Sequence, residues 1–393
     1  MAAAVPALWA CTSRTLEAPT IAPTATVGKM FTQKVNNKID ILFMIDNSSS
    51  MTEMQQKLYD QLPLFMNVLE NLPIKPSLHV AVVSSDMGAP GDATTSIGCT
   101  PTGDDGNFQS APRGMCTATT LQNNANYIID EDMNTMNFTD PIATVFQCIA
   151  LLGQTGCGFE HQLASIDRAL GGDGSDAPSG NNGFLRDDAY LGIVLLTNED
   201  DCSAPTNTQL FSINSGGSNQ QNIMNALGPV QNYRCNQFGH LCNDANGNQI
   251  MPPLNPPNGA TTLDLTDCVS NDTDSGLLVP VKQYINDIKS LKPDPDNQIL
   301  VAAVSGPPAP YSVAWVPEMG AQNPQPGELW PEVEHSCGAK GTDDVNPEST
   351  MSPTDGSFGD PGVRIAQFVS AFPNFVLASI CDPTYATSLQ AIA

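Results

Sequence analysis

Charged residues are scarce in this chain, and basic residues are the scarcest among them. Charged side chains make up 14% of the 393 residues, and 15 lysines and arginines stand against 41 aspartates and glutamates, giving a net charge of −26. This balance argues against a nucleic-acid partner, because contacts to phosphates need clustered lysine and arginine. The excess of carboxylates suits an exterior that attracts cations, although a solvated acidic surface is the simplest interpretation of most of them.

Several motifs of known chemistry are also missing. The sequence contains no H-E-x-x-H, no G-x-S-x-G and no phosphate-binding glycine loop, which weakens the case for a common hydrolase. Its cysteines do not form C-x-x-C pairs, so a zinc ribbon is not indicated. After residue 11 no apolar run approaches the roughly 20 residues of a membrane span.

Eleven cysteines are many for a reduced cytosolic protein of this size. Ten of them are spread along loop-rich segments, and in an oxidising compartment they are expected to form five disulfides. Proximity along the chain favours pairing Cys148 with Cys157 and Cys235 with Cys242, and Cys337 with Cys381 is a further candidate pair. The ten disulfide candidates are Cys99, Cys116, Cys148, Cys157, Cys202, Cys235, Cys242, Cys268, Cys337 and Cys381.

The remaining cysteine, Cys11, follows the apolar run AAAVPALWA. This end of the run resembles a bacterial lipobox, so residues 1–11 are interpreted as a signal peptide remnant with Cys11 as the lipidation site. Residues 12–36, rich in Thr, Ala and Pro, then form a flexible linker. We therefore expect an exported protein: an outer-membrane lipoprotein, periplasmic or at the cell surface, that contacts the membrane only through this anchor. The alternative is a signal peptide cut elsewhere, which would leave Cys11 without a role.

The core pattern begins with a nearly unbroken apolar run at residues 39–45, which predicts a strand buried on both faces. Apolar residues at steps of three and four over 51–69 predict an amphipathic helix, which Pro63 is expected to bend or end. Further strands are expected at 78–84, 190–197, 298–305 and 375–380, and further helices at 142–152, 160–170, 277–291, 363–372 and 383–393.

Strands that alternate with helices indicate an α/β fold with a doubly wound, mostly parallel central sheet and helices on both faces. The strands resume after each long, loop-rich segment, so these segments are interpreted as disulfide-bearing insertions in one domain, residues 37–393. The insertions cover about 86–140, which has room for a short hairpin edge, 202–276 and 306–360.

The candidate site is the loop after the first strand, which reads Asp46-Asn47-Ser48-Ser49-Ser50. In open α/β sheets, ligands collect beyond the carboxyl ends of the strands. There the D-x-S-x-S pattern offers a carboxylate and two hydroxyls in front of a helix, a set of hard oxygen donors that suits Mg²⁺, Ca²⁺ or Mn²⁺ better than zinc. Aspartate and serine are also common helix caps, and in isolation the pattern would indicate capping.

The buried strand ending in Met-Ile-Asp, the serine-rich loop and the amphipathic helix resemble the metal-ion-dependent adhesion site (MIDAS) of von Willebrand factor type A (vWA) domains. The resemblance extends through the element order of residues 37–393. It implies a doubly wound fold and a cation held by an aspartate through water and by two serines directly. A threonine and an aspartate from two later loops complete the family site, and one coordination position stays open for a carboxylate of the partner.

Carried over residue by residue, the resemblance matches Asp46, Ser48 and Ser50 fully. Glu160 falls where the family has its threonine, and Thr155 is nearby but out of register. A glutamate ligand here adds negative charge and fills space that a partner carboxylate needs. It also favours Ca²⁺, which accepts more ligands in looser geometry.

Asn198 falls where the family has its later aspartate, and Asp200 could substitute if the loop bends. Segments 82–88, 156–160 and 198–202 are further similar to those of cysteine-bearing vWA-domain lipoproteins of myxobacteria. The complete set of metal ligands that the resemblance implies is Asp46, Ser48, Ser50, Glu160, Asn198 and Asp200.

Three functions are compatible with these residues. The favoured one is a binding module without enzymatic activity that recognises a protein or another envelope macromolecule through its metal-bearing face. A metal-dependent hydrolase would have to use Glu160, Asp200 or Asp201 with a histidine, of which His161 adjoins Glu160. The third is a Ca²⁺-stabilised envelope component without a specific ligand.

Overall fold

The computed structural model describes residues 36–89, 99–113, 116, 121–132, 135–211, 227–228, 231–317, 329–338 and 356–393. The expected signal peptide, Cys11 and the linker up to residue 35 lie outside these residues.

A central sheet organises the described residues, with seven strands in the order β14-β9-β5-β1-β2-β3-β4. Five of them run parallel: β1 (Lys38–Ile45), β2 (Ser77–Ser84), β5 (Tyr190–Leu196), β9 (Ile299–Ser305) and β14 (Asn374–Ser379). The hairpin of β3 (Ile128–Asp132) and β4 (Thr135–Met136) forms an antiparallel edge. The chain adds strands on one side of β1 and then, from β5, on the other, which is the doubly wound order. The predicted fold class and the hairpin edge are confirmed.

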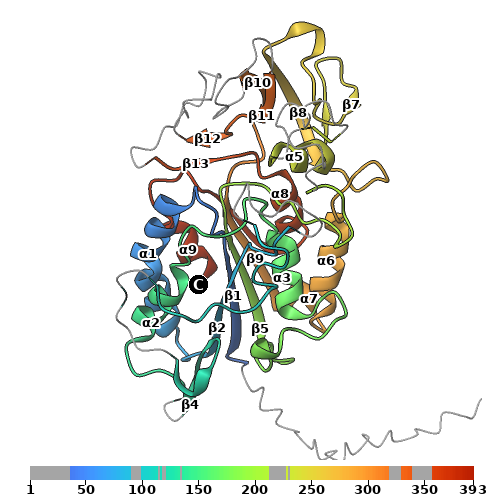
Figure 1. The fold of residues 1–393 in the computed structure, drawn as a ribbon. Coiled ribbons are helices and arrows are strands. Elements are labelled where there is room, and N and C mark those ends of the chain that lie inside the picture. Colours follow the sequence, from blue (N-terminus) through green and yellow to red (C-terminus); the bar gives the residue numbers. More distant parts are fainter. Residues whose placement is uncertain are drawn as a thin grey trace, which may run out of the picture. The chain divides into compact units, whose positions relative to one another are not determined.

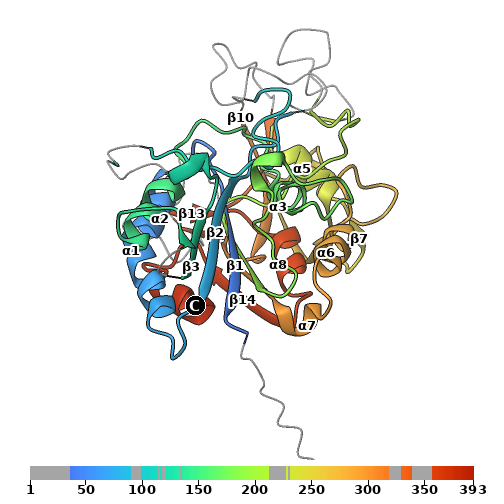
Figure 2. The ribbon, with the colours of Figure 1, turned by 90° about the horizontal axis from the view of Figure 1, so that it is seen from below.

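Helices cover both faces of this sheet (Figures 1 and 2). One face carries α1 (Thr52–Glu70), α2 (Ile142–Ala150) and α9 (Ala386–Ile392), and the other carries α3 (Gln162–Leu170), α6 (Val281–Ser290) and α8 (Val363–Val369), with the short α7 (Pro295–Gln298) before β9. Along β1, Phe43 packs with the first group and Leu42 with the second, because successive strand side chains point to opposite faces. Among the described residues no helix combines the length and hydrophobicity needed to span a bilayer.

Helix α1 continues through Pro63, contrary to the prediction that proline could end it. Proline removes a backbone donor, so the carbonyl of Tyr59 loses its usual partner four residues on. The side chain of Gln147 on α2 donates to this carbonyl at 2.7 Å. A neighbouring helix therefore satisfies the group that the proline leaves unpaired.

The described parts of the insertions at 202–276 and 306–360 contain more regular structure than the sequence indicates. Together they build a second sheet, which in the described residues has the strand order β11-β10-β8-β6-β7 and antiparallel pairing. It packs around Leu265, Val313 and Trp315. Figure 1 shows it beyond the carboxyl ends of the central strands. Its elements are α5 (Tyr233–Gly239), β6 (His240–Asn243), β7 (Gln249–Ile250), β8 (Thr262–Ser270), β10 (Tyr311–Pro317) and β11 (Leu329–Val333), followed by the small pair β12 (Cys337–Gly338) and β13 (Phe358–Gly359).

All ten cysteines of the described residues form disulfides, as predicted. The expected pairings of Cys148 with Cys157 and of Cys235 with Cys242 are wrong, because helices α2 and α5 carry the first cysteine of each pair toward partners that are distant in sequence. The pairing of Cys337 with Cys381 is confirmed. The five bonds are Cys99–Cys157, Cys116–Cys148, Cys202–Cys235, Cys242–Cys268 and Cys337–Cys381. Such a network is typical of an oxidising compartment.

Asp167 on α3 makes the stability of the fold depend on pH. It is 3% exposed, and its Oδ1 has no hydrogen-bond partner among the described residues. Burial, with the charges of Asp287 and Asp173, raises its pKa to about 8. The folded state therefore holds this proton more tightly than the unfolded state, and stability falls as pH rises from about 4 to about 8.

Asp167→Asn is expected to remove this decline, because an amide carries no charge to desolvate. At pH 8 the variant should exceed the wild type in free energy of unfolding, by up to about 1.4 kcal/mol for each unit by which the pKa is raised. Chemical denaturation at several pH values measures the effect, with the exposed Asp60→Asn as control. Parallel pH profiles for Asp167→Asn and wild type would contradict the prediction.

Candidate cation-binding site

Asp46 lies immediately after β1, next to the point where the sheet changes winding direction between β1 and β5. It is fully buried and accepts three hydrogen bonds. The backbone amide of Ser48 donates to Oδ1 at 2.8 Å, Ser85 Oγ to Oδ1 at 3.2 Å, and Thr197 Oγ1 to Oδ2 at 2.7 Å. Burial raises the pKa of Asp46, and these hydrogen bonds oppose that rise. The loops after β1, β2 and β5 thus fix one carboxylate.

The serines of this loop do not cap the helix that follows. Helix α1 begins after Met51 without a side-chain hydrogen bond at its cap. Instead Ser48 Oγ and Ser50 Oγ lie 3.2 Å apart, and Ser50 Oγ donates to Asn198 Oδ1 at 3.2 Å. The structure therefore does not support the capping interpretation, and it brings three of the sequence-predicted donors together.

Glu160 adds a carboxylate to this group. Its side chain is 2% exposed, yet its Oε1 has no hydrogen-bond partner among the described residues. Burial raises its pKa well above the usual range, and the charges of Glu199 and Asp46 raise it further. Thr155, the out-of-register alternative, lies on the same cavity wall but is exposed.

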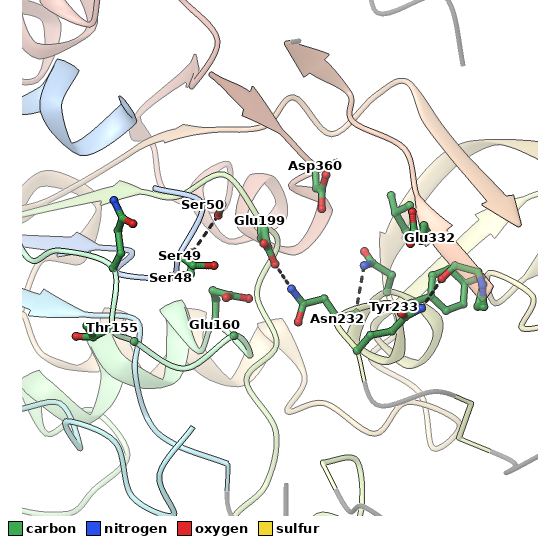
Figure 3. Close-up of a pocket in the computed structure, with 17 residues that line it drawn as sticks. Ser48, Ser49, Ser50, Thr155, Glu160, Glu199, Asn232, Tyr233, Glu332 and Asp360 are labelled. Atoms are coloured by element: carbon green, nitrogen blue, oxygen red, sulfur yellow. Dashed lines mark hydrogen bonds between the residues drawn. The ribbon is translucent and has the colours of Figure 1, made fainter. Parts of the chain in front are cut away.

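Glu199 belongs to the site although the sequence prediction omits it. Burial, with the charge of Asp360, raises its pKa to about 8. Asn232 at the start of α5 donates its side-chain amide to Glu199 Oε2. Figure 3 shows Glu160 and Glu199 at the same cavity. The sequence signal was the acidic run at 199–201, which does not reveal which member faces the site.

Asp200 is not brought into this group. Its Oδ2 accepts from His240 Nε2 at 2.7 Å and from the backbone amide of Arg364 at 2.8 Å, and its Oδ1 accepts from the amide of Ile365 at 3.1 Å. Asp200 therefore holds the start of α8. The neighbouring Asp201 forms a buried ion pair with Arg364 at 2.9 Å.

The histidines that a hydrolase would need are engaged elsewhere or neutral. Burial lowers the pKa of His161 to about 4, and its ring packs 5.2 Å from that of Phe211. His79 contacts a carbonyl oxygen, and His240 and His335 pair with aspartates. None of these contacts involves Glu160. These positions give no support to acid–base catalysis at this site.

The donors suit a hard divalent cation. Hydroxyl, amide and carboxylate oxygens are the ligands of Mg²⁺ and Ca²⁺. The unpartnered Glu160 Oε1 is a buried carboxylate oxygen that lacks a compensating partner, which a cation would supply. Within the described residues no group of three or more His, Cys, Asp or Glu side chains could hold a metal ion. A cation here must therefore also use the serine hydroxyls and Asn198.

Comparison with known proteins adds little. No family model and no curated protein matches the chain. Among solved structures, the vWF domain of the type V pili tip protein Mfa5 from Porphyromonas gingivalis is 11% identical, with a TM-score of 0.33, covering 91% of this chain and 95% of that one. The pilus adhesin SpaC from Lactobacillus rhamnosus GG in its open conformation is also 11% identical, with a TM-score of 0.33, covering 91% of this chain and 30% of the adhesin. At these scores the likenesses carry no argument, and the fold assignment stands on strand order and packing.

Proposed function

We propose that this chain is an exported vWA-type binding module without enzymatic activity. It takes a divalent cation, Mg²⁺ or Ca²⁺ with Mn²⁺ also compatible, and recognises a protein or another envelope macromolecule at the cavity face. The observation that carries the proposal is the meeting of Ser48, Ser50 and Asn198 beside an unpartnered Glu160 oxygen, with helix α1 uncapped by either serine. The tether to the membrane remains the expected lipid on Cys11.

In this proposal Ser48, Ser50, Asn198 and Glu160 hold the cation, and Asp46 orients the loop and balances charge through its three hydrogen bonds. The bound ion supplies a positive centre for recognition. The protein fixes its position, because Gln55 of α1 ties the loops together: its amide nitrogen donates to the carbonyls of Asp46 at 2.7 Å and Gly153 at 2.9 Å.

Titration calorimetry of the full chain with Mg²⁺ and Ca²⁺ tests the cation site. Replacing both ligand serines, Ser48→Ala with Ser50→Ala, is expected to weaken binding by about 10–100-fold, the usual penalty for a disturbed metal site. Ser49→Ala is the matched control, because this exposed serine lies between the two. Equal affinities for the double variant and the control would exclude the assignment.

Metal-dependent recognition is tested with the same double variant on a solid support. Components of an envelope extract that bind the wild type should be released by a chelator, should not bind the double serine variant, and should still bind Glu53→Ala, which changes an exposed residue of α1 outside the cavity. If the bound components stay on the support when the chelator is added, the result would favour a structural role for the cation.

A further inference from the structure

The candidate cation site opens into a cavity of about 630 Å³. One wall comes from the central sheet and carries Ser48, Ser50, Glu160 and Glu199 (Figure 3). The opposite wall comes from the second sheet and α5, the elements that the two insertions build. The residues of this second wall are Gln231, Asn232, Tyr233, Asn236, Pro331, Glu332 and Val333.

The described residues of charged type that line this cavity are all acidic. Four carboxylates line it, those of Glu160, Glu199, Glu332 and Asp360, and none of its 17 lining residues is a lysine, arginine or histidine. Asp46 adds a fifth carboxyl group behind the loop, and His335 pairs with Asp360 at 2.7 Å. The acidic groups around the site therefore outnumber the two positive charges of a divalent cation.

A second observation indicates that the cavity takes a positively charged group. Glu160 is 2% exposed and lines the cavity, and its Oε1 has no partner among the described residues. A buried carboxylate without a compensating charge is costly, because desolvation is not repaid. Glu199 shares a hydrogen bond with Glu160 and accepts another from the neutral amide of Asn232. Neither glutamate has an ion pair within the described residues.

We propose that the partner inserts a cationic side chain, an arginine guanidinium or a lysine ammonium, into this cavity beside the metal. The inference rests on the proposed function and specifies its partner. A partner carboxylate would meet Glu199, Glu332 and Asp360 at close range, and like charges in a shielded cavity repel strongly. A guanidinium presents several donors in a planar fork and matches carboxylates that arrive from different segments.

The cavity is suited to such a side chain in size and lining. A volume of about 630 Å³ falls within the range of small-molecule sites, and it accommodates a long side chain with part of its backbone. Tyr233 is one of the lining residues, and its hydroxyl donates to the carbonyl of Pro253 at 2.7 Å. The overall charge of −26 steers a basic partner toward the molecule.

The test uses the full chain and four peptides, acetyl-Gly-Gly-X-Gly-Gly-amide with X as arginine, lysine, citrulline or glutamate. Citrulline has nearly the shape of arginine without its charge. In saturating Mg²⁺, the arginine or lysine peptide should bind at least about tenfold more tightly than the citrulline and glutamate peptides, as measured by calorimetry. Stronger binding of the glutamate peptide, or equal binding of arginine and citrulline peptides, would overturn the inference.

A pair of variants separates the cavity from the acidic surface. Glu332→Gln with Asp360→Asn should weaken the binding of the arginine and lysine peptides by about tenfold, because two acidic groups of the cavity are lost. Glu53→Gln with Asp60→Asn changes the net charge equally at exposed positions of α1 and should have little effect. Equal losses in both pairs would show non-specific attraction and overturn the inference.

The metal titration distinguishes this inference from the proposed function. Neither Glu332 nor Asp360 is a proposed ligand, so calorimetric Mg²⁺ binding should persist in that pair, which also reports an intact fold. If the chain binds arginine peptides but no divalent cation, the proposed cation site fails and the basic partner stands. If it binds Mg²⁺ and prefers the glutamate peptide, the cation site stands and the basic partner fails.

Discussion

Asp46→Ala is expected to weaken Mg²⁺ and Ca²⁺ binding by about a hundredfold, the upper end of the usual penalty for removing a residue that orients metal ligands. The substitution removes a negative charge and the acceptor that the Ser85 and Thr197 hydroxyls share, leaving them the longer contacts to Asn47 Oδ1 at 3.5 Å and to the carbonyl of Glu199 at 3.1 Å. Because these donors reach Asp46 from the loops after two other strands, their loss also loosens the position of Ser48 and Ser50. Titration calorimetry on the full chain measures the change.

Two further variants make the Asp46 result specific. Glu53→Ala removes an exposed carboxylate seven residues further along and should leave affinity unchanged. Asp46→Asn keeps the size of the side chain, so it separates loss of charge from loss of packing, and we expect it to weaken binding by at least about tenfold. Wild-type affinity in Asp46→Asn and Asp46→Ala, with an unchanged melting temperature, would exclude Asp46 from the site.

Arg364→Met should lower the free energy of unfolding by about 3–5 kcal/mol, the usual cost of removing one partner of a buried ion pair. Arg364 is fully buried and pairs with Asp201 at 2.9 Å. Its guanidinium also donates to Ser270 Oγ and to the carbonyl of Val279, both at 2.8 Å. Methionine has a similar length but leaves the Asp201 charge uncompensated in the interior.

Denaturant titration under non-reducing conditions measures the Arg364 effect. Arg168→Met is the control, because Arg168 pairs with Asp105 at a partly exposed surface site, where such a pair contributes at most about 1 kcal/mol. Adding Asp201→Asn to Arg364→Met should recover part of the loss, since the uncompensated charge is then gone. No recovery in the double variant would show that packing of the arginine, and not its charge, stabilises this region.

The central sheet could be predicted because its strands show their burial directly in the sequence. The run at residues 39–45 is apolar on both strand faces, and the structure buries it on both. Asp46, Ser48 and Ser50 could be recognised in the sequence as candidate site residues for the same reason, because a recognisable strand ends next to them. The local sequence pattern is therefore sufficient to predict a strand whose own residues show that both of its faces are buried.

The second sheet could not be predicted in this way, because β6, β7 and β8 lack a long apolar run and β8 has a partner strand that is distant in sequence. In β8 only Leu265 and Ser270 are buried, and the apolar alternation is limited to Leu263 and Leu265. It pairs with β10, and the central strand β9 lies between them in the sequence. The insertions do contain the loops and prolines that suggested irregular structure. Pairing between β8 of one insertion and β10 of the other nevertheless forms a regular sheet.

Glu199 illustrates a limit at the site itself. Three acidic residues follow Asn198, and the sequence does not reveal which one faces the cavity. The choice depends on Arg364 and His240, which bind Asp201 and Asp200 and turn them away. Both partners come from distant segments, so no spacing rule within the loop identifies the third acid.

The division of the cavity between two sheets has a consequence for how its specificity can change. The proposed metal ligands come from loops of the central sheet, whereas Asn232 and Glu332 belong to the insertions. Substitutions in the insertions can therefore diversify which partner is accepted while the chemistry of the ion stays constant, because changes at separated positions are largely additive. A library that varies Gln231, Asn236, Glu332 and Val333, and keeps Cys235 in its disulfide and Asn232 on Glu199, would retain one metal centre and sample many recognition surfaces.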